Sequence, residues 1–316
     1  MIRFNFYAPG RSPEELARFK TSKLTDINPP DLKETQETVT LQAFLVLKER
    51  MEGCELSTAL DPDAINIAAT IDLPRLPPPG RPFMVAARAD AYPRYWADLE
   101  MVHNKGQLKP GAFWMPHFPQ LGLIPRDPAR GSTFTTIGYM GRPINYIAFK
   151  GLFRSGFVQI AEEVDAICKR LGLKLVMKGA DSWHDNSDID AVVGIRDFTG
   201  NLFKSKPAVK LFNAWAAGVP FIGGPDSAFL ESGEPEWNYL RIFTAQDLEK
   251  ALTRLQGDAD LRKTLVERGK VLSTQYGLEQ TAQRWMSLLK GAATERFLEQ
   301  RDARAQPDAR RASQKS

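Results

Sequence analysis

Two lysines, Lys206 and Lys210, have the residue type and spacing that most directly suggest chemistry in this chain. The segment around them, residues 206–218, is predicted to form a helix, because a proline near its start suits a first turn and Gly218 followed by Pro220 suits a helix end. Lysines at this spacing repel each other, more so near the positive end of the helix dipole. A bound anion would remove that conflict, since free backbone N–H groups and two ammonium groups can hold a phosphate. A solvated lysine face is the alternative and the commoner meaning of such a pair.

An arginine at the end of a predicted strand adds a third cation. The apolar run 191–195 is expected to be a buried strand, and Arg196 follows it directly. At a strand's carboxyl end an arginine can clamp a phosphate through two hydrogen bonds, so Arg196, Lys206 and Lys210 are expected to converge on one diphosphate. An ion pair between Arg196 and Asp197 is the alternative interpretation.

A glycine-rich loop follows the next predicted strand, residues 219–223. Gly223 and Gly224 would let the backbone approach a ligand closely. Glu231, rather than Asp226, is expected to hydrogen-bond the hydroxyl groups of a ribose or sugar. The alternative is a turn followed by an ordinary charge at a helix N-terminus.

The elements that must position these side chains alternate between strand and helix in two sets. The expected strands are 2–7, 65–71, 83–87 and 102–104 in the first set, and 134–140, 173–178, 191–195 and 219–223 in the second. The expected helices are 39–51, 92–101, about 147–171, 206–218, 245–256, 259–275 and 278–291. Residues 10–36 are polar and show no clear period. The alternation predicts two doubly wound parallel sheets joined near residues 125–133, with a ligand cleft between their carboxyl ends.

Composition narrows the class of protein. The chain has 316 residues, 43% hydrophobic and 25% charged, which is typical of a soluble globular protein of two domains. Only two cysteines occur, Cys54 and Cys168, which fits a reducing cytoplasm. The net charge of +4 is concentrated in residues 301–316, which carry five basic and two acidic residues. The nearly neutral body argues against strong nucleic-acid binding; the tail would serve solubility or make a weak contact with an anionic membrane surface.

The second half of the chain resembles a known superfamily. Residues 206–225 contain Lys-Leu-x-Asn-Ala-Trp-x-Ala-Gly-Val-Pro-x-Ile, which is similar to the Glu-Ala-x-Ala-x-Gly-x-Pro segment of GT-B fold glycosyltransferases. The resemblance implies an α/β, GT-B-like fold in which two doubly wound, Rossmann-like domains face a cleft. The implied division is an acceptor-side domain at 1–128, a nucleotide-sugar donor-binding domain at 132–277, a helix at 278–293 that packs back on the first domain, and a disordered basic tail at 294–316.

The resemblance also implies which residues hold the donor. Many retaining members carry two glutamates spaced Glu-x7-Glu, but here those positions are Ser205 and Asn213, so the stereochemical outcome is left open. Gly141-Arg142 with Lys150-Gly151 is similar to the family's Gly-Arg…Lys-Gly phosphate contacts, at a longer spacing. The implied donor and phosphate residues are Arg142, Arg196, Lys206, Lys210, Asn213, Gly223, Gly224, Ser227 and Glu231.

Transfer of a sugar from a nucleotide sugar requires stabilisation of the departing diphosphate. The resemblance implies that cationic side chains and a helix N-terminus supply it, with no metal ion and no cofactor, and that the nucleotide is of the UDP or GDP type. Asp188-Ile-Asp190 could instead hold a metal ion, but a polar loop with capping roles is the preferred interpretation.

Two residues of the first half are candidates for the base that deprotonates the acceptor hydroxyl. Asp90 follows the strand at 83–87 near its carboxyl end, while His117 has the better intrinsic pKa. Each type is more often structural than catalytic. The further acceptor-side candidates are Tyr92, His103 and Asn104.

These residues favour a glycosyltransferase that moves a sugar from a nucleotide-diphosphate sugar to a hydroxyl of a carbohydrate or lipid-linked acceptor, in polysaccharide or glycoconjugate biosynthesis. The expected location is the cytoplasm, with the inner face of the membrane as a further option. A nucleotide-sugar epimerase of GT-B architecture and a non-catalytic binding protein remain as alternatives. A dinucleotide oxidoreductase is disfavoured, because no Gly-x-Gly-x-x-Gly follows the first strand.

Overall fold

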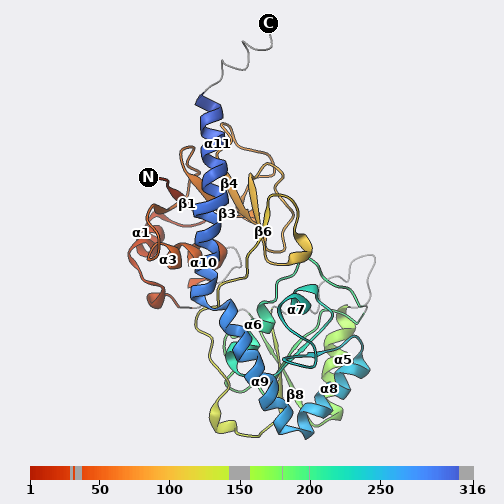
Figure 1. The fold of residues 1–316 in the computed structure, drawn as a ribbon. Coiled ribbons are helices and arrows are strands. Elements are labelled where there is room, and N and C mark those ends of the chain that lie inside the picture. The colour runs from red at the N-terminus through yellow and green to blue at the C-terminus, as the bar shows by residue number, and fades with distance from the viewer. Residues whose placement is uncertain (29–30, 33–37, 142–156, 180, 199, 306–316) are drawn as a thin grey trace.

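The computed structural model describes residues 1–28, 31–32, 38–141, 157–179, 181–198 and 200–305. Within them the chain forms two β-sheets, one in each half, with helices packed against both (Figure 1). All the strand pairings in the two sheets are parallel. The carboxyl ends of the strands in each sheet therefore lie at one edge, and the expected α/β class with two Rossmann-like sheets is confirmed.

The first sheet has six strands in the order β2-β1-β3-β4-β5-β6. They are β1 (Phe4–Tyr7), β2 (Cys54–Ser57), β3 (Ile65–Ala69), β4 (Met84–Ala87), β5 (Leu99–Val102) and β6 (Ala112–Trp114). The sequence gives little sign of β2, because Leu56 is the one buried residue of this edge strand. The prediction of a helix at 92–101 is wrong: the Trp96 indole donates to the Pro74 carbonyl at 3.0 Å, and the chain enters β5 at Leu99.

Helices cover the first sheet mainly on one face. They are α1 (Pro13–Thr21), the π-helix η3 (Thr38–Gln42) and α3 (Ala43–Leu47), joined there by helices from the end of the chain. The α1 helix lies in a segment without apolar periodicity, and a capping box of Ser12 and Glu15 defines its start. The crossings from β3 to β4 and from β4 to β5 are described throughout and contain no α-helix, only the 3-10 turn η4 (Thr70–Asp72).

The second sheet has five strands in the order β11-β10-β9-β7-β8. They are β7 (Thr136–Met140), β8 (Lys174–Lys178), β9 (Ala191–Gly194), β10 (Phe221–Gly223) and β11 (Leu240–Arg241). The helices of this half are α5 (Phe157–Arg170), α6 (Val209–Ala217), α7 (Ser227–Ser232), α8 (Ala245–Gly257) and α9 (Ala259–Ser273). The remaining 3-10 turns are η1 (Leu24–Asp26), η5 (Lys105–Gln107), η6 (Pro128–Arg130) and η7 (Thr274–Tyr276).

The end of the chain returns to the first sheet through α10 (Leu278–Leu288), the π-helix η8 (Leu289–Ala293) and α11 (Thr294–Ala305), as Figure 1 shows. Trp285 of α10 lies against Phe6 and Phe118, with ring centroids 6.5 and 6.0 Å apart. Residues 294–305 were expected to be disordered but are helical. The reason is an apolar anchor, since Phe297 is buried against the Phe83 ring at a centroid distance of 5.6 Å.

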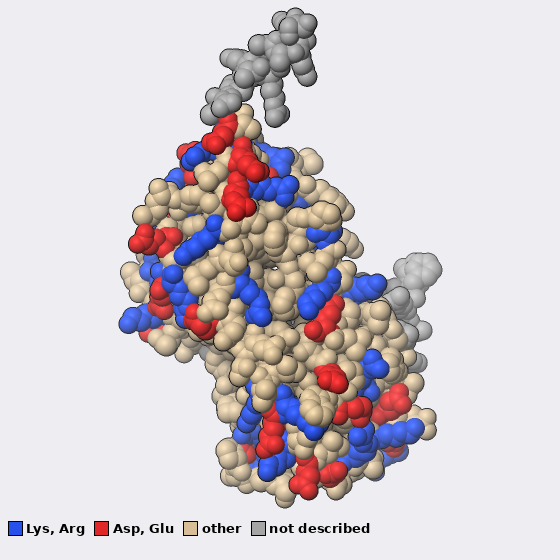
Figure 2. All heavy atoms as spheres, viewed as in Figure 1, with Lys and Arg blue, Asp and Glu red and all other residues tan. Residues whose placement is uncertain are grey.

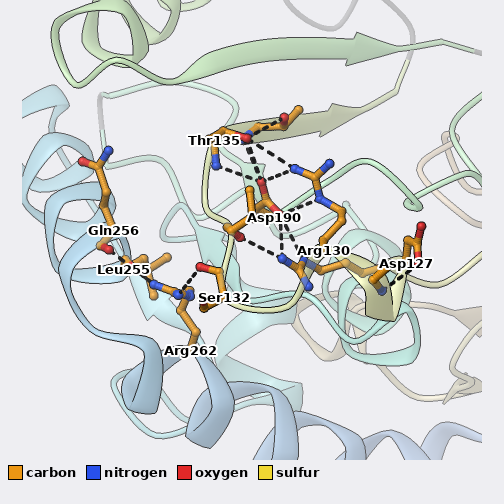
Figure 3. Close-up of polar contacts among 12 residues, drawn as sticks. Asp127, Arg130, Ser132, Thr135, Asp190, Leu255, Gln256 and Arg262 are labelled. Carbon is orange, nitrogen blue, oxygen red and sulfur yellow. Dashed lines mark hydrogen bonds and ion pairs between the residues drawn. The ribbon is translucent and has the colours of Figure 1, made fainter.

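The segment between the sheets is fixed to the amino end of β9 by a buried carboxylate. Arg126 and Arg130 both pair with Asp190, at 2.8 and 2.6 Å, and the side chain of Asp190 is fully buried. The backbone N–H groups of Thr135 and Thr136 also donate to Asp190, as Figure 3 shows for Thr135. Burial alone would raise the pKa of Asp190, but the hydrogen bonds from Arg130 and the backbone lower it to about 2. Asp190 therefore serves as the anchor of the interdomain segment.

Charge is mixed over the surface. On the face seen in Figure 2, basic and acidic side chains are interspersed over both halves of the molecule. In the part of the chain that the structure describes, none of the helices combines the length and apolar character needed to cross a bilayer.

Candidate functional site

The carboxyl edges of the two sheets meet through a buried asparagine. Asn104 follows β5 and is completely buried. Its amide Nδ2 donates to the Lys206 carbonyl and to Ser227 Oγ, both at 2.8 Å, and Ser227 donates back to Asn104 Oδ1 at 3.0 Å. The next residue, Lys105, donates its backbone N–H to Glu231 at 2.7 Å. Loops of the first half are thus bonded directly to the loop before α6 and to α7.

A buried group of charges lies at the carboxyl edge of the second sheet. Arg196, which follows β9, pairs with Asp226 at 2.6 Å, and Asp226 is fully buried. Lys210 of α6 places its ammonium 3.6 Å from the centroid of the Tyr139 ring on β7. That ammonium is buried and has no hydrogen-bond partner among the described residues. Burial lowers the pKa of Lys210 well below its ordinary value, and the nearby charge of Arg196 adds to the effect.

Lys206 does not share the helical face of Lys210 that the sequence predicted. The helix starts at Val209, so Lys206 lies in the loop before it. Its ammonium bonds the carboxylate of Asp90, which follows β4 in the first half. Burial raises the pKa of Asp90, but the hydrogen bond and charge of Lys206 outweigh it, and the pKa is lowered overall. A predicted phosphate ligand, Lys206, and a predicted acceptor base, Asp90, therefore form one ion pair between the two halves of the chain.

The structure assigns packing roles to part of the predicted donor loop. A Cβ atom on Gly223 would lie 2.8 Å from Phe221 and 3.0 Å from Phe229, so glycine is required there by its neighbours. A Cβ on Gly224 would meet nothing closer than 3.5 Å, which leaves space beside Asp226. Ser227 and Glu231, expected to contact the donor, bond Asn104 and Lys105 in this structure.

Asn213 contacts a side chain that the sequence did not predict. Its amide Nδ2 donates to Gln120 Oε1 at 2.5 Å, and Gln120 belongs to the segment between the sheets. Asn213 and Lys210 are three residues apart on α6, but their side chains contact different elements, at Gln120 and Tyr139, respectively. The helical wheel placed them on one face, but it took no account of what packs beside the helix.

Two stacked histidines lie at the carboxyl end of β5. The rings of His103 and His117 are 3.8 Å apart at their centroids and inclined by 31°. Nδ1 of His103 donates to the Met115 carbonyl at 2.6 Å, which leaves Nε2 of the neutral ring as an acceptor. Burial lowers the pKa of His103 to about 4, and burial with the charge of His103 lowers that of His117 well below its ordinary value. Both rings are therefore neutral at pH 7.

The predicted residues thus divide into two groups. Asp90, Arg196, Lys206 and Lys210 interact electrostatically with one another, together with Asp226, which the sequence ranked below Glu231. His117 and Asn213 line a separate pocket beside α6. Arg142 lies outside the described residues, and Tyr92 is almost fully exposed, at 86%. Tyr139 was not predicted; its only sequence signal is its place near the carboxyl end of a strand.

The fold can be compared with solved structures once this geometry is known. TarM matches with a TM-score of 0.51 at 10% identity, covering 79% of this chain, which spans 58% of the TarM chain. Anabaena Alr3699/HepE in complex with UDP matches with a TM-score of 0.53 at 12% identity, covering 92% of this chain and 99% of that one. The same protein in complex with UDP and glucose gives 0.50 at 13% identity, with the same coverage. These likenesses confirm a fold of the GT-B type and, at such identities, speak to the fold alone.

No protein-family model matches the sequence, and no curated protein matches it either.

Proposed function

We propose that this protein is a glycosyltransferase that moves a sugar from a nucleotide-diphosphate sugar to a hydroxyl acceptor. The observation that carries the proposal is the group of three cations, Arg196, Lys206 and Lys210, at the facing carboxyl edges of two parallel sheets. Ligands of such sheets bind at this edge. The buried ammonium of Lys210 has no hydrogen-bond partner among the described residues, and a phosphate oxygen would supply one.

The donor class follows from the charge and from the fold. A diphosphate is the leaving group that three cations suit best, and the HepE structures of similar fold contain UDP. We assign the donor to the UDP or GDP type and assign stabilisation of the leaving group to side-chain cations rather than to a metal ion. The acceptor would be a carbohydrate or lipid-linked hydroxyl, in polysaccharide or glycoconjugate synthesis at the cytoplasmic side of the membrane.

The transfer step requires one bond to form as another breaks. The acceptor oxygen bonds the anomeric carbon, while the bond from that carbon to the phosphate oxygen breaks and its electron pair stays on the diphosphate. The hydroxyl proton passes to a base. Asp90 is held by Lys206 without donor, so a diphosphate that attracts Lys206 would free the carboxylate for this role.

Nucleotide binding tests the proposal directly. We expect UDP or GDP to raise the melting temperature of the full chain, and the corresponding nucleoside to do so far less. Lys206→Met should weaken nucleoside-diphosphate binding about tenfold, the cost of one charge-assisted contact. Lys204→Met, which removes an exposed lysine two residues earlier, is the matched control and should bind normally. Failure of every nucleoside diphosphate to bind would refute the proposal.

A second measurement separates transfer from its alternatives. The protein is incubated with a panel of nucleotide sugars, and free nucleotide is measured with and without glycoside acceptors. Acceptor-dependent release supports a transferase. Interconversion of the nucleotide sugar without release indicates an epimerase, and binding without either reaction indicates a non-catalytic protein; both results would contradict the proposed reaction.

A further inference from the structure

A pocket of about 290 Å³ lies where both chain crossings between the sheets pass the side of α6. One crossing leads from β6 to β7 and the other from α9 to α10. The first contributes residues 117–120 and 123, the second contributes residues 273–274 and 276–277, and α6 contributes Val209, Phe212, Asn213 and Ala216. The pocket is thus built from three segments far apart in sequence.

The lining is aromatic and uncharged. Phe212 and Tyr276 stack with ring centroids 4.3 Å apart, and Phe118 adds a third ring. Among the described lining residues, none is an aspartate, glutamate, lysine or arginine. Apolar walls with a few polar groups are typical of small-molecule sites, and an uncharged lining does not suit a diphosphate.

The polar groups of the lining retain hydrogen-bonding capacity. The contact between Asn213 and Gln120 uses one N–H and one oxygen, so each amide keeps further donor or acceptor sites.

We propose that this pocket binds one uncharged, hydroxylated ring, the sugar ring of the acceptor, against the stacked rings of Phe212 and Tyr276. The aromatic rings would contact the C–H groups of the sugar, and the amides of Gln120 and Asn213 would hydrogen-bond its hydroxyls. The volume is at the lower end of the roughly 300–1,000 Å³ usual for ligand sites, which limits the occupant to about one ring.

The location connects the pocket with the cation group. Asn213 and Lys210 are three residues apart on α6 and are therefore neighbours on the helix surface. His117 stacks on His103, and the next residue, Asn104, bonds the Lys206 carbonyl. A ring in the pocket would lie beside the proposed diphosphate site, so this inference rests on the proposed function and names its acceptor.

Binding of simple sugars to the full chain tests the inference without any donor. The probes are methyl glycosides of glucose, galactose, mannose and N-acetylglucosamine, with glucuronate as an anionic counterpart, measured by saturation-transfer NMR. Ala216→Leu would fill the pocket from its exposed wall while keeping a strong helix former. Ala303→Leu makes the same change at an exposed position on α11 and is the matched control.

We expect at least one neutral glycoside to bind, Ala216→Leu to weaken that binding by about tenfold or more, and Ala303→Leu to leave it unchanged. Binding of none of the glycosides, equal binding to Ala216→Leu, or tighter binding of glucuronate than of the glycosides would each overturn the inference. UDP and GDP binding is measured on the same samples. Nucleotide binding without sugar binding refutes the acceptor pocket alone, whereas sugar binding without nucleotide binding refutes the proposed donor.

Discussion

Asp190 and Asp226 are both fully buried aspartates of the second sheet, but they lie at opposite ends of it. Asp190 precedes β9 at the amino edge and is bonded by two arginines and two backbone N–H groups. Asp226 follows β10 at the carboxyl edge, is bonded by Arg196, and has one oxygen without a partner among the described residues.

The pKa values of the two carboxyl groups reflect their different hydrogen bonding. Hydrogen bonds at Asp190 overcome burial and lower its pKa to about 2, whereas burial dominates at Asp226 and raises its pKa. Buried polar groups in stable regions are fully bonded, so the amino edge has the character of a structural anchor. The carboxyl edge is incompletely bonded, since the ammonium of Lys210 has no hydrogen-bond partner among the described residues, and such an arrangement is typical of a site for a charged ligand.

The largest expected effect on stability comes from substitution of Asp190 at the amino edge of the second sheet. Asp190→Asn would remove the buried charge that the partly buried Arg126 and Arg130 share, and we expect a loss of about 3 kcal/mol in the free energy of unfolding. Urea denaturation measures the loss. Asp226→Asn is the matched substitution and should cost less, because Asp226 accepts from Arg196 and has one oxygen without a partner among the described residues, whereas Asp190 accepts from two arginines and two backbone N–H groups. Equal losses in the two variants would remove the contrast between the two edges.

As the pH falls, His103 at the carboxyl edge of the first sheet should lose its contribution to stability before Asp190 at the amino edge of the second sheet does. The pKa of His103 is about 4 when folded against an ordinary 6.5, so the folded state binds fewer protons between these values. The contribution of this histidine is complete above pH 6.5 and is lost as the pH falls toward 4, at a cost of roughly 2–3 kcal/mol. Asp190, by contrast, loses its contribution only as the pH falls from 3.8 to about 2.

Chemical denaturation from pH 7 to pH 4 measures this loss. His103→Gln retains a donor for the Met115 carbonyl and should flatten the dependence across that range. A variant with the same pH dependence as the original chain would assign the acid sensitivity elsewhere.

The smallest expected effect on stability is that of Lys210→Met, which should weaken nucleotide binding without destabilising the fold. Lys210→Met removes a buried ammonium that has no partner among the described residues, so we expect stability to hold or to rise by about 1 kcal/mol. Binding of UDP or GDP should weaken about tenfold in the same variant. Calorimetric titration and thermal melting give both values, and a variant that loses stability but binds normally would make Lys210 a structural residue.

Much of the scaffold was predictable, because its signals are local. Apolar runs such as 191–195 and the glycine–proline stop after residue 217 predict strand β9 and the end of α6, and both form close to the expected residues. Elements with weak local signals were missed or misassigned. The edge strand β2 buries a single side chain, and residues 294–305 are helical because Phe297 packs against Phe83.

The candidate site was predictable only in its parts. Sequence reasoning selected Arg196, Lys206 and Lys210 because cations at a strand end or helix start suit phosphate. It could not see that Lys206 precedes the helix and pairs with Asp90, which lies 116 residues away in sequence. Nor could it place Asn213 against Gln120, because a helical wheel shows only the residues of the helix itself and not the segments that pack beside it.

The sequence by itself determined the alternation of strands and helices, the parallel α/β class and the chemical types available at the strand ends, because periodicity and turn residues act over short distances. Only the tertiary structure decided which of those groups meet. The stacking of His103 on His117, the Asn104 bridge between the halves and the uncharged pocket beside α6 all join segments distant in the chain. The partners, burial and pKa values of these side chains depend on tertiary packing, which cannot be inferred from local sequence patterns.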